Sequence, residues 1–229
     1  MSSIKVIDSI RIRPKGVLVK DANGKYVILH RRQGHMDGAC AVYSLSMALL
    51  CIGAVTEEDL DIFNKPDRRT PKGKFLSHFL DEQGMVRSGY SYSTLRKEIN
   101  EQSFGIRVRR RNPRDKEKLI GLIADTLDED KPVIISTVFT DGAHAMLAVG
   151  YEFCDKNGAI MKILCLDPSE EAPTFSSWNC IIDVSHIHSK SEFPFDNITK
   201  SQSYKVALRD ILIIENKKYF YKKIGLDKG

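Results

Sequence analysis

Cys40 stands where a polar, glycine-rich segment gives way to an apolar one, in the stretch RRQGHMDGACAVYSLSMALLCIG at residues 31–53. The apolar residues that follow Cys40 recur at helical spacing, which predicts a helix from Cys40 to about Gly53. The free N–H groups and the dipole at a helix N-terminus favour a thiolate over a thiol. The position of Cys40 therefore predicts a nucleophilic sulfur.

A thiol nucleophile needs an imidazole that takes up its proton and later returns it. Among the six histidines, His144 follows a glycine turn at the start of an apolar strand, where its ring can face a cleft from a rigid backbone. Asp167 ends the next expected strand, and its carboxylate can hold the imidazole in the productive tautomer. Attack on a carbonyl also creates an oxyanion, for which the candidate donors are the Cys40 backbone N–H and the Gln33 amide.

The chain resembles the papain-like cysteine peptidases, most closely the bacterial C39-like peptidases, in four stretches: QGHMDGACAVYSLSMALL from residue 33, LDEDKPVIIS from residue 127, GAHAMLAVGY from residue 142 and LDP from residue 166. The resemblance covers roughly residues 30–170 and keeps the family order of Gln, Cys, His and Asp. It implies a papain-like fold and cleavage of peptide bonds through a thioester. In this family Cys40 would be the nucleophile, His144 the acid and base, Asp167 the orienting group and Gln33 the partner in the oxyanion hole.

The interval of seven positions from Gln33 to Cys40 is one longer than is usual in the family. Either the loop between them bulges or another group is the donor, and the sequence leaves both possibilities open. A weaker likeness to staphopain and to bacterial effector proteases is consistent with an effector or processing protease. The expected partner is a protein or peptide substrate.

The periodicities predict an α+β protein with a helical first half and a sheet-rich second half. A hairpin through Asn23-Gly24 is expected near the N-terminus. Further helices are expected after Thr56, from Thr70-Pro71 to Gly84, at Ser93 to Ile99 and in PRDKEKLIGLIADTLDED, and strands at Ile106 to Val108 and in PVIISTVF, HAMLAVGYEF, IMKILCLD, WNCIIDV and YKVALRDILIIE. With the resemblance, we expect one papain-like catalytic domain over residues 1–229, with a β-hairpin at 1–32, a mainly helical lobe at 33–130 and a mainly β lobe at 131–229.

The 229 residues carry a net charge of +5 and five cysteines, a size that suits one core or two lobes around a cleft. The cysteines are odd in number and lack a C-x-x-C pair, which argues against a disulfide framework and a structural zinc site. No stretch is long and apolar enough for a membrane span, and the N-terminus does not resemble a secretory signal. We therefore expect a cytoplasmic protein that needs no metal or cofactor and has no membrane partner; its oligomeric state stays open.

Other reactive or charged residues have plainer interpretations. The basic run RVRRRNPRDKEK at residues 107–118 could contact nucleic acid, but the acidic residues within it favour a solvated strand end and helix start. Nucleic acid is therefore not an expected partner. His186 and His188, at alternate positions of an expected strand, lack further metal ligands at suitable spacing and are expected at the surface. His35 is expected at the rim of the cleft, and the cysteines in apolar runs are expected in the core: Cys51, Cys154, Cys165 and Cys180.

Two further functions remain open. The same Cys-His-Asp site could transfer the acyl group to an amine, as in a transglutaminase, or act as a deamidase, because a thioester can react with several acceptors. Alternatively, the fold could be a non-catalytic binding module that uses the basic run.

Overall fold

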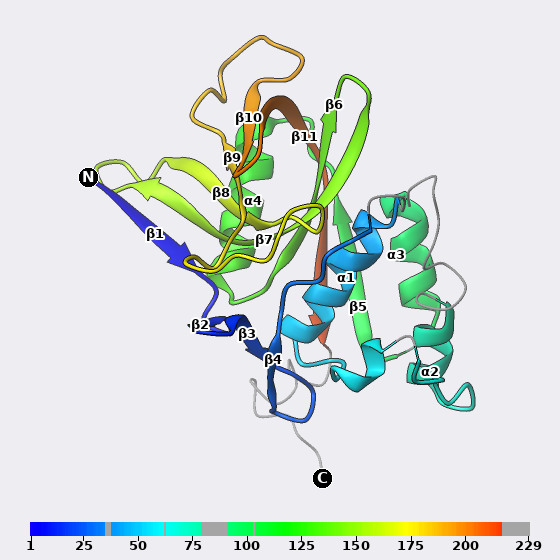
Figure 1. The fold of residues 1–229 in the computed structure, drawn as a ribbon. Helices are drawn as coiled ribbons and strands as arrows, with labels where there is room; N and C mark the ends of the chain where they lie inside the picture. Colours follow the sequence, from blue (N-terminus) through cyan, green and yellow to red (C-terminus); the bar gives the residue numbers. More distant parts are fainter. Residues whose placement is uncertain (35–37, 62, 79–90, 103, 217–229) are drawn as a thin grey trace.

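The structure is a computed structural model that describes residues 1–34, 38–61, 63–78, 91–102 and 104–216. Its helices and strands follow the chain in this order (Figure 1): β1 (Ser2–Val6), β2 (Arg11–Arg13), β3 (Gly16–Lys20), β4 (Tyr26–Ile28), α1 (Cys40–Cys51), the short 3-10 helix η1 (Glu58–Leu60), α2 (Pro71–Leu76), α3 (Tyr92–Glu101), β5 (Ile106–Arg111), α4 (Lys116–Asp128), β6 (Val133–Phe139), β7 (Gly142–Cys154), β8 (Ile160–Leu166), β9 (Cys180–Asp183), β10 (Phe195–Thr199) and β11 (Ser203–Asn216). The fold is thus a mixture of helices and strands, and the helices among the described residues all precede β6.

A small antiparallel sheet of β2, β3 and β4 precedes α1. Gly24, in the turn between β3 and β4, has a φ of +77°, a conformation that glycine adopts without steric cost. This arrangement confirms the hairpin predicted through Asn23-Gly24. The sequence did not predict β1, which pairs instead with the far end of β7.

α1 begins at Cys40 and is followed by Gly53 at a φ of +59°, as the sequence predicted. Thr56 and Asp59 then form a reciprocal capping box, because the N–H of each donates to the side chain of the other, at 2.8 and 3.1 Å. The box opens only the single turn of η1, and the longer helix expected there is wrong. Asp61, directly after η1, already has an extended backbone.

Side-chain oxygens cap the other helices: Thr70 at α2, Ser91 at α3 and Asp115 at α4. These three helices were predicted, although the expected end of α2 at Gly84 lies outside the described residues. α4 is amphipathic as expected, with Leu119, Ile123 and Leu127 buried. Within the described ranges, no helix has the length and apolar character needed to cross a membrane.

The strands from β6 to β11 form a closed antiparallel ring, because each of them pairs with two others of the set. The order around the ring is β7, β6, β11, β10, β9 and β8, and β8 returns to β7. β1 extends the ring along β7, and β5 extends it along β11. The sequence predicted these strands except β1 and β10.

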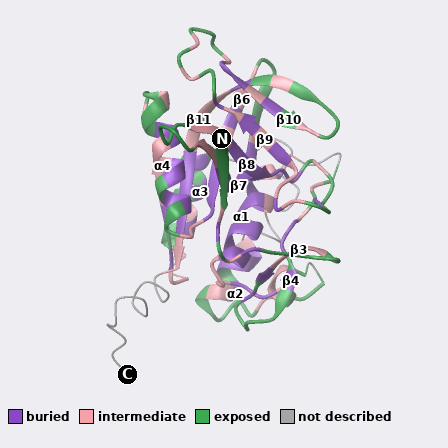
Figure 2. Ribbon diagram, turned by 90° about the vertical axis from the view of Figure 1, so that its left-hand side faces the viewer, coloured by how far each residue is buried: buried purple, intermediate pink, exposed green. Residues whose placement is uncertain are grey.

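β7 is covered on both faces, since residues 145–150 are buried without interruption. Successive residues of a strand point to opposite faces, so unbroken burial needs cover on both sides. α1 and α4 both contact β7 and lie on different sides of the sheet (Figures 1 and 2). β7 is therefore a rigid central support.

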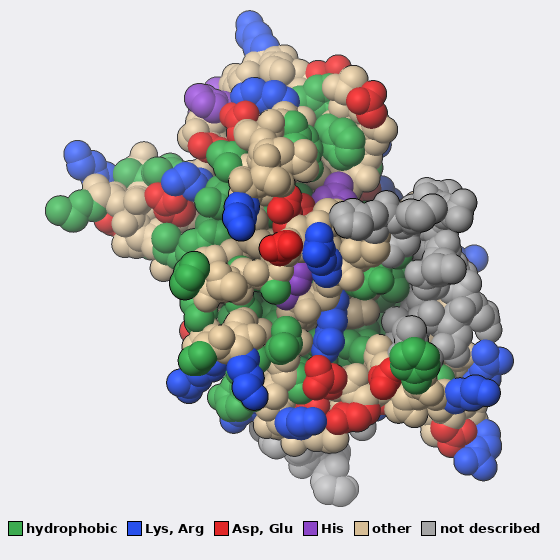
Figure 3. Space-filling model, in the orientation of Figure 1, with side chains coloured by type: hydrophobic (Ala, Val, Ile, Leu, Met, Phe, Trp, Pro, Cys, Tyr) green, Lys and Arg blue, Asp and Glu red, His purple; other side chains and the backbone are tan. Residues whose placement is uncertain are grey.

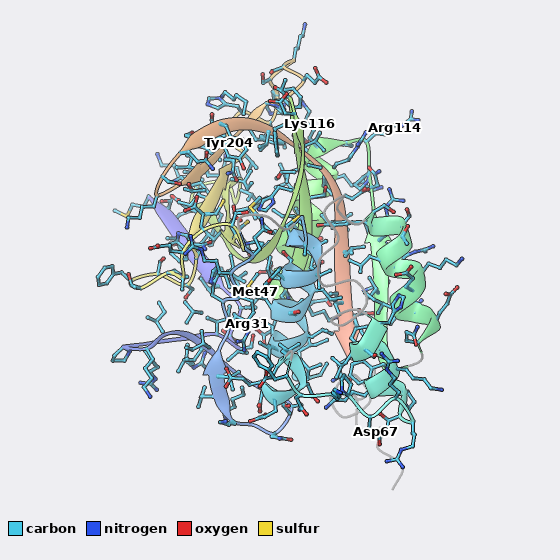
Figure 4. All side chains as sticks on the ribbon, turned by 45° about the vertical axis from the view of Figure 1, so that its right-hand side comes forward. Arg31, Met47, Asp67, Arg114, Lys116 and Tyr204 are labelled. Atoms are coloured by element: carbon cyan, nitrogen blue, oxygen red, sulfur yellow. The ribbon has the colours of Figure 1, made fainter. Side chains whose placement is uncertain are left out.

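One cluster of buried hydrophobic residues includes α1 and both sheets, with members such as Val19, Met47 and Leu147. Met47, labelled in Figure 4, is fully buried on α1. The described residues do not separate this core into two parts, so the division into two lobes stays a prediction. The Cys helix is packed directly on the strand that carries His144.

We expect that Gly150→Ala destabilises the protein by about 1–3 kcal/mol, because overpacking at a close backbone approach forces the chains apart. A Cβ at Gly150 would lie 3.1 Å from Val6 Cα and even closer to the Lys5 carbonyl oxygen, where β1 pairs with β7. The matched control is Gly121→Ala in α4, where no atom lies within 4 Å of the new Cβ. We expect this control to stabilise the protein by about 0.5–1 kcal/mol. Urea denaturation measures the change in the free energy of unfolding for both variants. Equal changes would contradict the tight β1–β7 contact.

Candidate active site

The sulfur of Cys40 lies at the N-terminus of α1, in a side chain that is partly exposed. It forms a side-chain hydrogen bond with His144. The backbone N–H groups of Ala41 and Ala145 also donate to it. One of these N–H groups comes from the first turn of α1 and the other from β7, so the sulfur lies at the junction of helix and strand.

This junction is fixed by buried hydrogen bonds between side chains and the strand backbone. The hydroxyl of Ser44, one turn after Cys40, donates to the Ala145 carbonyl at 3.2 Å. The hydroxyl of Tyr92 on α3 donates to the Ile135 carbonyl on β6 at 2.8 Å. A buried carbonyl that loses its donor leaves an unsatisfied polar group, so these contacts resist sliding of the helices over the sheet.

His144 is the third residue of β7, and its ring lies between the Cys40 sulfur and the Asp167 carboxylate. Its Nε2 donates to Asp167 Oδ1 at 2.7 Å, which leaves Nδ1 as the nitrogen that can face the sulfur. The two side chains are nearly inaccessible, with 12% of His144 and 4% of Asp167 exposed. Leu166 pairs with Leu147, so the end of β8 brings Asp167 beside the start of β7. The structure thus brings together three of the four predicted site residues, namely Cys40, His144 and Asp167.

The electrostatics of this group favour a thiolate and an imidazolium. Burial disfavours the charged imidazole, but the hydrogen bonds to Asp167 and Cys40 outweigh it and raise the pKa of His144 to about 10. Burial likewise disfavours the thiolate, yet the hydrogen bond and charge of His144 outweigh it, and the pKa of Cys40 falls below its usual value. As the pH rises, Cys40 therefore ionises first, and His144 keeps its proton until about pH 10. Between these two pKa values the ion pair is the stable form.

Gln33 reaches the site through the turn that follows β8. Its backbone N–H donates to the Pro168 carbonyl at 2.8 Å, and its Nε2 donates to Ser169 Oγ at 3.0 Å. Ser169 Oγ lies 3.3 Å from His144 Nε2, the nitrogen that faces Asp167. The amide of Gln33 is therefore on the carboxylate side of the imidazole, and its nitrogen is directed at Ser169. Its Oε1 is buried and has no hydrogen-bond partner among the described residues.

Ser169 is a site residue that the sequence analysis missed. Its N–H donates to Asp167 Oδ1 at 2.7 Å, so the carboxylate accepts from both the imidazole and the turn. A turn in which an aspartate side chain accepts a hydrogen bond from the backbone N–H two residues later is common. The sequence Asp167-Pro168-Ser169 is a signal for such a turn. Asn179 and His30, which bond to the backbone of Asp167, were also missed. No local pattern marks them, because their partner is distant in the sequence.

The remaining histidines and cysteines do not join this group. His186 and His188 lie in a turn, and the expectation of alternate strand positions is wrong. The chain turns there because the Asp183 carboxylate accepts from both the N–H and the hydroxyl of Ser185, at 2.9 and 2.6 Å. His35 lies outside the described residues. Within the described part of the chain, no cluster of three acidic, His or Cys residues could hold a metal ion. Three other thiols are buried as expected, and burial raises the pKa of each: Cys51, Cys165 and Cys180. Cys154, at the end of β7, is partly exposed, and the expectation of a core position is wrong there.

The basic run is partly neutralised by acidic residues of β11. Arg109 pairs with Glu215 at 2.6 Å, and Arg110 pairs with Asp210 at 3.0 Å. Arg114 and Lys116 are labelled at the periphery in Figure 4, away from the core. Basic and acidic side chains are interspersed on the face shown in Figure 3. These pairings make the run a part of the sheet rather than a uniform positive surface.

Comparisons with known proteins add little. No protein-family model and no curated protein sequence matches the chain. Among solved structures, the chain is similar to UfSP from C. elegans, with 14% sequence identity and a TM-score of 0.46. The match covers 94% of this chain and 34% of that structure, so the chain spans about a third of its length. A likeness of this degree carries no conclusion about activity.

We expect iodoacetamide to alkylate Cys40 selectively in the native protein at pH 6, about tenfold faster than any other cysteine, because the thiolate is the reacting species. Mass spectrometry of tryptic peptides measures the rate for each thiol. Cys154, which is also partly exposed, controls for accessibility. Equal rates at Cys40 and Cys154 would show that the sulfur is not activated.

We expect Asp167→Asn to shift the pH dependence of this alkylation upward by about one to two units. The Asp167 carboxylate raises the pKa of His144, and the imidazolium in turn lowers the pKa of Cys40. Loss of the carboxylate therefore raises the pKa of Cys40, and less thiolate is present at any given pH below it. Alkylation rates from pH 5 to 10 measure the shift. An unchanged profile would mean that Asp167 does not act on the sulfur through the imidazole.

Proposed function

We propose that this protein is a papain-like cysteine peptidase that cleaves peptide bonds through a thioester. The observation that carries the proposal is the chain of contacts from the sulfur of Cys40 through His144 to the carboxylate of Asp167. A nucleophile, a proton carrier and an orienting group in this order are what acyl transfer requires. Cys40 is the proposed nucleophile, His144 the proposed acid and base, and Asp167 the proposed orienting residue.

In the first step the Cys40 thiolate attacks the carbonyl carbon of a peptide bond, and the electron pair of the C=O bond moves to oxygen. The tetrahedral intermediate collapses when the C–N bond breaks and His144 gives its proton to the leaving amine. The thioester remains on Cys40, and the imidazole is neutral. His144 then takes a proton from water, whose hydroxide attacks the thioester and releases the carboxylic acid. The sulfur leaves as a thiolate, and the ion pair is restored.

The oxyanion needs hydrogen-bond donors at the moment when the negative charge forms on it. The backbone N–H of Cys40 is one proposed donor. Gln33 is the other, and for this role its amide must exchange Ser169 Oγ for the oxyanion.

We further propose a close relationship to the bacterial C39-like peptidases, in one catalytic domain that includes the N-terminal hairpin, a helical lobe and a β lobe. This rests on the order of Gln33, Cys40, His144 and Asp167 and on the sequence around each of them. A role in processing or as an effector, with a protein or peptide substrate, follows from the same resemblance.

We expect Cys40→Ala and His144→Ala to lower the rate of peptide cleavage by about 1,000-fold or more while the protein stays folded. Incubation with a peptide mixture from a digested proteome, followed by mass spectrometry of new termini, measures cleavage. Circular dichroism checks folding. The matched control is Cys51→Ala, which removes a buried thiol at the other end of the same helix and should retain activity.

The same incubation with a labelled primary amine separates the two acyl-transfer outcomes. New peptide termini support hydrolysis. Amide adducts without new termini would replace the peptidase by a transglutaminase-type enzyme. Neither product from the native protein, or equal cleavage by Cys40→Ala, would overturn the proposed function.

A further inference from the structure

Asp167 is the first residue after β8, beyond the last pairing of β8 with β9. The last paired residues of β8 and β9 are Cys165 and Cys180. Beyond them the chain leaves the sheet through residues 168–178 and returns at Asn179. The peptide groups of Asp167 therefore have no strand partner from β9. A buried backbone group without a partner costs free energy, and a loosely held Asp167 would let the imidazole move.

The side chain of Asn179 takes the place of that missing partner. Its Oδ1 accepts from the Asp167 N–H at 2.7 Å, and its Nδ2 donates to the Asp167 carbonyl at 2.9 Å. The same Nδ2 donates its second hydrogen to the Glu171 carbonyl at 3.0 Å. The oxygen of the Asn179 amide can only accept hydrogen bonds, and its nitrogen can only donate them. One N–H and two carbonyls as partners therefore determine which way the amide is oriented. The amide thus binds both polar backbone groups of the residue whose carboxylate holds His144.

A second side chain supports the same carbonyl. His30 Nε2 lies 2.9 Å from the Asp167 carbonyl oxygen, so this nitrogen carries a hydrogen. Burial is the largest effect on His30 and lowers its pKa, so the ring is neutral at neutral pH. Because both Asn179 and His30 donate to it, the Asp167 carbonyl is held from two directions. Asn179 alone also binds the N–H of Asp167.

Ser169 cannot replace this support, because it belongs to the turn that it stabilises. Its N–H binds the carboxylate of Asp167 from two residues further along the chain. Asn179, in contrast, directly precedes β9, and its own N–H donates to the Cys165 carbonyl at 3.0 Å. It therefore ties the turn to the frame of the sheet.

We propose that Asn179 is a positioning residue that sets the orientation of the His144 imidazole by holding the backbone of Asp167. The inference rests on the proposed function for its consequence in catalysis. Asn179 does not touch the reacting sulfur; it acts through Asp167 on the tautomer and direction of the ring. Its loss therefore weakens the Cys40–His144 ion pair without removing any member of it.

The experiment compares Asn179→Ala with Asn100→Ala. Asn100 makes the same pair of bonds elsewhere, because its Oδ1 accepts from the Val108 N–H at 2.9 Å and its Nδ2 donates to the Val108 carbonyl at 3.0 Å. Asn100 is on α3 and Val108 is on β5, outside the candidate site. Replacement of Asn100 by alanine therefore removes the same two kinds of hydrogen bond, but far from Asp167 in the sequence. Thermal denaturation of both variants measures the structural cost.

Alkylation of Cys40 by iodoacetamide from pH 5 to 10 is the main readout, since it needs no substrate. We expect Asn179→Ala to slow alkylation at pH 6 about tenfold and to move the midpoint of the profile upward, because a displaced Asp167 stabilises the imidazolium less. Asn100→Ala should keep the native profile. With the most rapidly cleaved peptide from the proteome digest, we expect kcat to fall by up to about 100-fold with little change in KM.

A second variant covers the case in which Asn179→Ala does not fold. Asn179→Asp has the same size and still accepts from the Asp167 N–H, but its carboxylate cannot donate to the two carbonyls. We expect the same upward shift of the alkylation profile. A native profile in a folded Asn179 variant would overturn the inference and leave the proposed peptidase intact. Failure of the peptidase itself would appear differently, as unimpaired cleavage by Cys40→Ala or His144→Ala.

Discussion

The interaction on which the site depends is the imidazole of His144 held between a sulfur and a carboxylate. All three groups are largely withdrawn from water, and burial alone would keep both the thiol and the imidazole neutral. The hydrogen bonds from ring to carboxylate and from ring to sulfur reverse this, so that the pKa of His144 rises and the pKa of Cys40 falls. Loss of His144 would remove the hydrogen bond and the charge that lower the pKa of Cys40, and loss of Asp167 would remove a hydrogen bond and a charge that raise the pKa of His144. The charge state of the site is therefore a property of the group and not of a single residue.

The scaffold explains how such a group stays assembled. Each member is at the end of a regular element: Cys40 at the start of α1, His144 near the start of β7 and Asp167 just after β8. α1 is buried over most of its length and packs on a strand that is itself covered on both faces. Because close-packed elements cannot slide without opening cavities, the distances between their ends are well determined. Hydrogen bonds from polar side chains then hold the backbone near the site: Ser44 bonds to Ala145, and Asn179 bonds to Asp167.

The basic residues of β5 also contribute to the sheet. The concentration of arginines on β5 faces acidic residues of β11 across the sheet, where Arg109–Glu215 and Arg110–Asp210 form ion pairs. Such cross-strand pairs stabilise a sheet, and they leave less of the positive charge free for an acidic partner. The structure therefore gives the binding-module alternative no specific support.

The sequence by itself determined the local features. The caps at Thr70 and Ser91, the turn at Gly24 and the helix that begins at Cys40 depend on contacts within a few residues, so a pattern of residue types is enough to predict them. It also nominated the candidate site residues by type, context and order. Where local signals were incomplete, as with the single turn after Thr56 or the turn at His186, the predicted element was wrong.

Only the tertiary structure decided which distant groups meet. The bond from His144 to Asp167 depends on the register of β7 with β8, and the support from Asn179 depends on where β9 begins after a loop. The direction of the Gln33 amide depends on Ser169, which is far from it along the chain. Likewise β1 was missed because its partner, the end of β7, lies some 150 residues away. These contacts depend on how the whole chain packs, and no local pattern of residue types records them.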